Sequence, residues 1–213
     1  GRDAGVFRYQ ATLSRLASTF TVTERQATAV GESAREAESF ATTQREAMQR
    51  SQTTAMTHAL GIQDSYEKSQ QRTGATSTSE GGSTNTQFQT LNSVARDVNR
   101  RLGLSDDSTV GKTIAASASI GAKIPLTEIG ADAKAEGRAV DQQTLQSAYD
   151  YARKAAESAQ FSDASALVKD FRSSDAYQWA RSNRTSATAG YDSSSREASE
   201  RQSSSDSAYG RAK

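Results

Sequence analysis

A seven-residue repeat of apolar side chains runs through the first third of the chain and constrains the fold more than any other feature. This spacing is the pattern of heptad position a in coiled-coil helices, and no proline interrupts it. Because one helix cannot bury such a row, we expect a helix over about residues 4–71 that packs on a second copy, a neighbouring helix or a partner. The predicted helix-packing seam consists of Val6, Leu13, Phe20, Ala27, Ala34, Ala41, Met48, Ala55 and Ile62.

The amino-acid composition favours alanine-rich helices over a large apolar core. Of the 213 residues, 35 are alanine and only 28 are Leu, Ile, Val or Phe, which is low for a globular chain. The 26 basic residues face 25 acidic ones, and this balance argues against nucleic-acid binding as the main activity. The absence of cysteine excludes a disulfide scaffold, a Cys-ligated zinc site and a Cys nucleophile.

We predict an all-α, elongated fold in four segments. Residues 1–72 form the long coiled-coil-like helix, and residues 73–86, rich in Gly, Ser and Thr, form a polar linker. Residues 87–182 form a smaller helical region, with an irregular Gly- and Pro-containing crossing around Pro125 for which a short hairpin is the alternative. Residues 183–213 form a polar Ser-rich tail, either a solvated helix or disordered.

Local signals set the expected helix ends in the third segment. A capping-box pattern at Thr86 and Gln89 begins one helix, and Gly103 followed by an apolar residue ends it. The next three residues, 105–107, are expected to cap another helix that runs to about Ile120. The apolar stripe of the first helix is Phe88, Leu91, Val94, Ala95, Val98 and Leu102.

Two more helices are expected in the same segment. One resumes at Val140, and Ser162-Asp163 caps the one that follows. The large side chains of this last helix are Leu167, Val168, Phe171 and Trp179.

Three motifs resemble functional sites, but a structural role fits each of them better. Gly111-Lys112-Thr113 resembles the end of a phosphate-binding loop, yet Asp106 stands where that motif needs glycine. Asp106 and Asp107 are adjacent carboxylates, as is common in a first helical turn. His58 is the only histidine and has no carboxylate cluster around it in the sequence. We therefore expect no catalytic, cofactor-binding or metal site and no enzymatic activity.

The order of segments and one central stretch carry a family resemblance. After the long helix and the Gly/Ser loop comes the stretch 91–126, LNSVARDVNRRLGLSDDSTVGKTIAASASIGAKIPL, and then a Ser-rich repeat with Arg and Tyr. This pattern resembles the C-terminal region of the TraG family of conjugal transfer proteins. The resemblance implies a bacterial type IV secretion setting, an inner-membrane anchor N-terminal to this region, and roles in mating-pair stabilisation and entry exclusion. It brings no catalytic motif.

The expected partners follow from this resemblance. They are an exclusion protein and other proteins of the conjugation apparatus, with self-association possible and no direct nucleic-acid binding. The chain has no run of apolar residues long enough to span a membrane, so we expect a soluble region. The resemblance implies that this region belongs to an inner-membrane protein and lies on either the periplasmic or the cytoplasmic side. Because binding residues favour loops on rigid scaffolds, the candidate recognition span is 66–85. Its candidate residues are Tyr66, Glu67, Lys68, Arg72 and Glu80.

A signalling rod such as a chemoreceptor cytoplasmic domain is the alternative. Such rods also consist of heptads rich in Ala, Ser, Thr, Gln and Glu. They need a characteristic hairpin tip, which this sequence lacks, because the turn after the long helix is the polar stretch 73–85.

Overall fold

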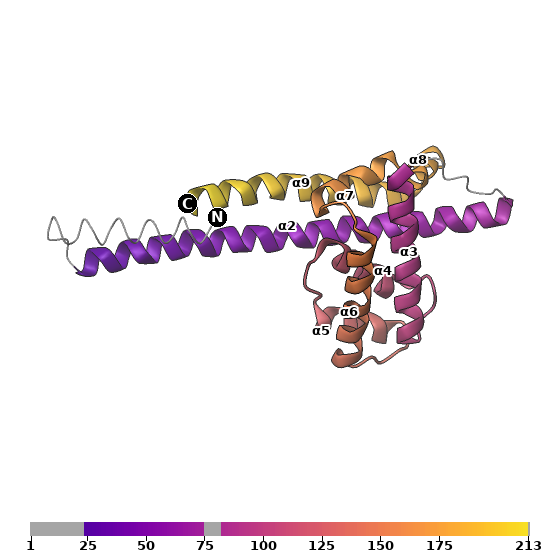
Figure 1. The fold of residues 1–213 in the computed structure, drawn as a ribbon, viewed down its shortest axis with the longest axis horizontal. Helices are drawn as coiled ribbons and strands as arrows, with labels where there is room; N and C mark the ends of the chain where they lie inside the picture. Colours follow the sequence, from indigo (N-terminus) through magenta and orange to yellow (C-terminus); the bar gives the residue numbers. More distant parts are fainter. Residues whose placement is uncertain (1–23, 75–81, 213) are drawn as a thin grey trace. The chain divides into compact units, whose positions relative to one another are not determined.

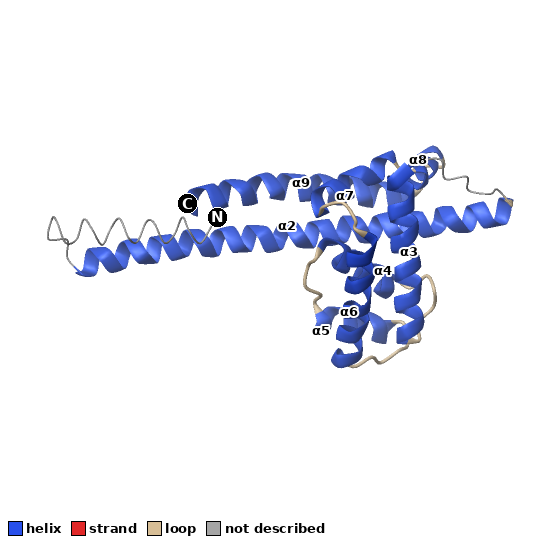
Figure 2. Ribbon diagram, in the orientation of Figure 1, coloured by secondary structure: helices blue, strands red, loops and turns tan. Residues whose placement is uncertain are grey.

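The computed structural model describes residues 24–74 and 82–212, and in these ranges the fold is all-α, as predicted. Figure 2 shows helices and loops without a strand in the described residues. The α-helices and the one 3-10 turn, labelled as in Figure 1, are α2 (Glu24–Thr73), α3 (Gly82–Leu102), α4 (Thr109–Ile120), α5 (Leu126–Ala135), α6 (Gln142–Ala159), α7 (Ala164–Asp170), η1 (Phe171–Ser173), α8 (Asp175–Ser182) and α9 (Ser186–Ala212).

The chain divides into two compact units. The central unit is Gln49–Arg196, and the terminal unit combines Gly1–Met48 with Glu197–Lys213. Helices α2 and α9 each contribute one part to both units. In the terminal unit, the buried side chains among the described residues are small: Ala41, Ala47, Ala198 and Ser205.

The predicted seam falls partly on described residues. Ala41 lies buried in the terminal unit, and Ala55 and Ile62 lie buried in the central unit. Ala34 and Met48 are half-buried. The first three seam positions, Val6, Leu13 and Phe20, lie outside the described residues, as does the side chain of Ala27.

Helices α3, α4 and α6 form the centre of the central unit, where each packs against the other two. The apolar stripe predicted on α3 is buried along its whole length, from Phe88 to Leu102. Helix α4 approaches α3 closely at Gly111, because a Cβ there would lie 2.4 Å from the Ala95 carbonyl oxygen and 2.3 Å from Asn99 Oδ1. A side chain larger than hydrogen would therefore force the two helices apart.

The turn between α3 and α4 confirms where α3 was predicted to end, but α4 begins later than predicted. Gly103 has φ +71°, and the Leu104 N–H donates to the Asn99 carbonyl at 2.8 Å, so α3 ends where predicted. Residues 105–107 belong to the turn and do not cap α4. The N-cap is Ser108, whose hydroxyl accepts from Val110 N.

Buried Asn99 explains why the turn extends to residue 108. Its side-chain amide donates to the carbonyls of Asp106 (3.1 Å) and Ser108 (3.0 Å), and its Oδ1 accepts from Gly111 N (2.8 Å). The bond to Gly111 N satisfies an N–H that the first turn of α4 leaves free, and the other two bonds hold the carbonyls of the turn.

The structure also corrects the regions on either side of this turn. Helix α3 begins at Gly82, earlier than the capping-box pattern predicted, so the last five residues of the predicted linker 73–86 are helical. Residues 121–125 form the irregular connection expected around Pro125, but helix α5 follows it immediately at Leu126. Sequence reasoning missed α5, whose small residues and Gly130 weaken its helical pattern.

The predicted helix after residue 162 is interrupted. Asp163 caps α7 as expected, but the chain then forms η1, and Ser174 caps a separate helix α8 through its bond from Tyr177 N. The sequence did not predict this break. Phe171 and Tyr177, on either side of Ser174, are both buried in the core. Most of the Ser-rich tail is helical, as α9, and not disordered, but the helix is not solvated on all sides, because Tyr191 is fully buried.

Aromatic rings join the last helices to α3. Phe171 packs edge-on against Phe88, at 4.8 Å between ring centroids, and against Tyr191, at 5.0 Å. Tyr191 is fully buried and donates its hydroxyl to the Val168 carbonyl. Burial also raises the pKa of this hydroxyl far above its ordinary value, so it stays protonated as a donor.

Candidate functional site

Four of the five candidate recognition residues, those from Tyr66 to Arg72, lie at the C-terminal end of α2, just after the part of the helix that the central unit buries. The preceding four turns carry buried side chains over one wide face of the helix. They are Ser51, Gln52, Ala55, Met56, Ala59, Leu60, Ile62, Gln63 and Asp64. The end of α2 is thus held on a rigid base.

Asp64 is the buried charge at this boundary, with a side chain only 5% exposed. Its carboxylate lies 3.2 Å from Lys68 Nζ, 3.2 Å from Arg96 Nη2 and 3.4 Å from Lys112 Nζ. Burial by itself raises the pKa of the Asp64 carboxyl, but these cations outweigh it and hold the pKa below its usual value. The carboxylate therefore stays charged and links α2 to α3 and α4.

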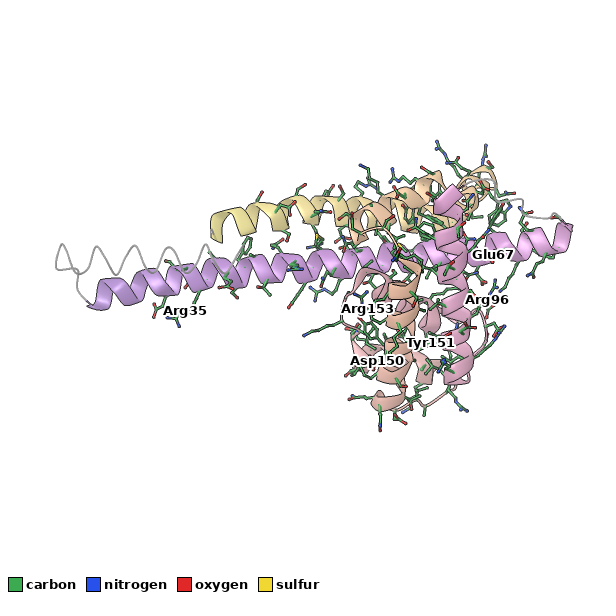
Figure 3. All side chains as sticks on the ribbon, viewed as in Figure 1. Arg35, Glu67, Arg96, Asp150, Tyr151 and Arg153 are labelled. Carbon is green, nitrogen blue, oxygen red and sulfur yellow. The ribbon has the colours of Figure 1, made fainter. Side chains whose placement is uncertain are left out.

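Glu67 also faces the interior of the unit. It accepts from Asn92 Nδ2 at 2.6 Å and from Gln63 Nε2 at 3.1 Å, and it lies 3.7 Å from Arg96 Nη2. Figure 3 labels Glu67 on α2 and Arg96 on α3. These contacts give Glu67 a role in holding α2 on α3.

Lys68 connects α2 to the α3–α4 turn. Its Nζ lies 3.1 Å from Asp107 Oδ2, and this hydrogen bond raises the pKa of Lys68. The bond from Ser105 Oγ (2.6 Å), together with Lys68, lowers the pKa of Asp107 to about 2. Lys68 nonetheless keeps 47% of its side chain exposed.

Lys112 is buried and makes its polar contacts within the central unit. It is 8% exposed, and its Nζ donates to the Asp107 carbonyl at 2.8 Å in addition to pairing with Asp64. Gly111 beside it packs on α3. The Gly111-Lys112-Thr113 motif thus serves helix packing in this structure.

Tyr66 lies on another side of α2. Its ring packs on Trp179 of α8, at 5.8 Å between centroids, and burial raises the pKa of its hydroxyl. His58 packs on Gly190 of α9, where a Cβ would lie 2.8 Å from the imidazole. Both contacts fix the helix within the central unit.

Beyond these contacts the end of α2 is exposed. Gln71, Arg72, Thr73 and Gly74 are all exposed. A shallow depression of about 440 Å³ is lined there by Lys68, Gln71 and Arg72. Of the five candidate residues, the structure therefore brings Lys68 and Arg72 to one surface and turns Tyr66 and Glu67 inward, while Glu80 lies outside the described residues.

Sequence reasoning missed the ion-pair network that supports this surface. Its six members are Asp64, Glu67, Lys68, Arg96, Asp107 and Lys112. Asp64 and Lys112 are 48 positions apart, and no periodic pattern relates them. The one available signal was a lysine within the small, apolar residues of α4.

Comparison with protein-family models, with curated proteins and with solved structures finds no match for this chain. In the described ranges 24–74 and 82–212, no helix is both long and apolar enough to cross a membrane. The same ranges hold no group of three or more His, Cys, Asp or Glu side chains placed to bind a metal ion.

Proposed function

We propose that this chain is a non-catalytic protein-interaction region of a TraG-like conjugation protein, acting in mating-pair stabilisation and entry exclusion. The observation that supports it best is the end of α2, where exposed residues 71–74 follow directly on buried, ion-paired turns. Recognition residues commonly lie on exposed segments that a rigid scaffold positions. The proposed partner is an exclusion protein of the recipient cell, as the family resemblance implies.

The structure narrows the proposed recognition span. Tyr66 and Glu67 are engaged with Trp179 and Asn92, so substitutions there would disturb the fold before they changed recognition. Among the described residues, no hydrogen bond or ion pair joins the polar residues 69–74 to another helix. Recognition is therefore proposed for 69–74 together with the exposed part of Lys68.

The order of helices disfavours the signalling-rod alternative. A hairpin rod requires a second long helix that returns directly alongside the first. Here the helices from α3 to α8 intervene between α2 and α9, and α3, α4 and α6 pack on one another.

A chimera tests the proposal in the full-length conjugation protein. Residues 69–74 are exchanged for the corresponding residues of a related plasmid's TraG-like protein, and conjugation is scored into recipients that carry either exclusion protein. A matched control exchanges exposed residues of α6, Lys154 and Ser158, instead. We expect only the α2 chimera to change its exclusion group. Normal transfer with unchanged exclusion would contradict the proposal.

A further inference from the structure

We propose that the depression lined by Lys68, Gln71 and Arg72 binds an acidic segment of the protein partner. This inference rests on the proposed function and names the chemistry of the partner at the same surface. The three residues lie three and four positions apart, so they share one face of the last two turns of α2.

The surface around the depression carries a net positive charge, as a count of its ionised side chains shows. The six members of the ion-pair network carry three positive and three negative charges, which cancel. Within the described part of the chain, the exposed Arg72 has no acidic side chain paired with it. Arg72 therefore adds an uncompensated positive charge next to a neutral network, and its guanidinium presents up to five donors to a carboxylate.

Lys68 also lines this depression, and its side chain is already held in place by ion pairs. Two carboxylates, those of Asp64 and Asp107, fix its ammonium group, which has three N–H donors. One donor is left for a further acceptor. Because the side chain is already ordered, a ligand that uses this donor loses little additional conformational freedom.

Asp107 opposes an acidic ligand. It lies 3.1 Å from Lys68 Nζ with 55% of its side chain exposed, and its pKa of about 2 keeps it charged at neutral pH. Removing this charge leaves Lys68 with one carboxylate in place of two. The surface thus contains one residue whose substitution should weaken binding and one whose substitution should strengthen it.

The test measures binding of a short Glu-rich peptide and of its Gln counterpart to the full chain, by fluorescence anisotropy. Exposed ion pairs contribute modestly, so we expect Arg72→Glu to weaken binding of the Glu peptide by about fivefold and Asp107→Asn to tighten it by about twofold. Lys154→Glu, a charge reversal at an exposed position of α6, should leave binding of the Glu peptide unchanged. Added salt should weaken the wild-type interaction.

Three results would overturn the inference: equal binding of the Gln peptide, equal loss in Arg72→Glu and Lys154→Glu, or weaker binding in Asp107→Asn. Circular dichroism of each variant separates these results from unfolding. If the chimera changes the exclusion group while Arg72→Glu leaves peptide binding intact, the proposed function stands. The inference that this surface binds an acidic segment then fails. If the chimera leaves exclusion unchanged, the proposed function itself fails.

Discussion

The central and terminal units share the same two long helices, α2 and α9, yet they bury very different side chains. The central unit buries Phe88, Phe171 and Tyr191, together with Leu and Ile side chains from several helices. The described part of the terminal unit buries alanine and serine. Apolar burial stabilises by about 25 cal/mol per Å², so an alanine contributes far less than a phenylalanine. Helix formation alone therefore does not make the two units equally stable.

Polar contacts between distant positions of the chain also hold the central unit together. The central unit has ion pairs between residues 39 and 48 positions apart, Lys68–Asp107 and Lys112–Asp64. In the terminal unit, Arg201 pairs with Glu197 and Thr42 donates to the Glu38 carbonyl, both within one helix turn.

The largest expected effect comes from the closest helix crossing in the central unit. Gly111→Ala would drive a Cβ into the Ala95 carbonyl, and we expect it to lower the free energy of unfolding by about 3 kcal/mol. The matched control is Gly130→Ala, whose Cβ would meet only Leu145 Cδ1 at 3.7 Å. That variant should be neutral or more stable by up to about 1 kcal/mol, since alanine favours helix. Chemical denaturation followed by circular dichroism measures both, and equal effects would contradict the close crossing.

The second-largest effect on stability is expected from the buried ion pair between Asp64 and Lys112. Asp64→Asn leaves Lys112 buried without its carboxylate, and we expect a loss of about 2 kcal/mol. The double variant Asp64→Leu/Lys112→Met should recover much of this loss, because an apolar pair avoids the unpaired charge. A double-mutant cycle of Asp64→Leu, Lys112→Met and the double variant, measured by urea denaturation, gives the coupling energy. Additive single effects would show that the pair does not interact.

The same network gives the central unit a defined acid sensitivity. The folded-state pKa values of Asp64 and Asp107 are lowered, so their stabilising contribution is complete above their unfolded values, near pH 4, and is lost as the pH falls towards about 2. Asp64→Asn should flatten this dependence in denaturation curves recorded across that range. An unchanged slope would assign the acid sensitivity to other carboxylates.

The smallest expected effect on stability tests the division of the chain into two units. Removing residues 197–213 takes away only residues of the terminal unit. We expect the free energy of unfolding of the central unit to change by less than about 1 kcal/mol, because every residue removed belongs to the other unit. Hydrogen exchange on α3 amides provides the measurement. Faster exchange throughout α3 would show that the two units stabilise each other.

The sequence predicted those features that depend on neighbouring residues. The buried stripe of α3 and its end at Gly103 follow from a 3.6-residue period and a left-handed glycine. The cap at Asp163 is equally local. The beginning of α4 was predicted too early because the bonds from Asn99 settle the turn, and an asparagine within a helix carries no mark of that role.

The candidate site was only partly predictable for the same physical reason. Lys68 and Arg72 could be recognised as charged residues near the end of a helix. The inward orientation of Glu67 depends on Asn92 and Arg96, which belong to another helix. Tertiary contacts of this kind decide which face of α2 is exposed, and a heptad pattern with few large side chains does not specify them.

The packing of Tyr66 on Trp179 gives the molecule a built-in optical reporter. Trp179 is the only tryptophan in the chain, so its fluorescence arises from a single environment. Its ring lies 5.8 Å from that of Tyr66, two residues before Lys68 on α2. Excitation energy passes readily from tyrosine to tryptophan over such a distance. Displacement of this part of α2 by a partner would therefore change the emission without any attached dye.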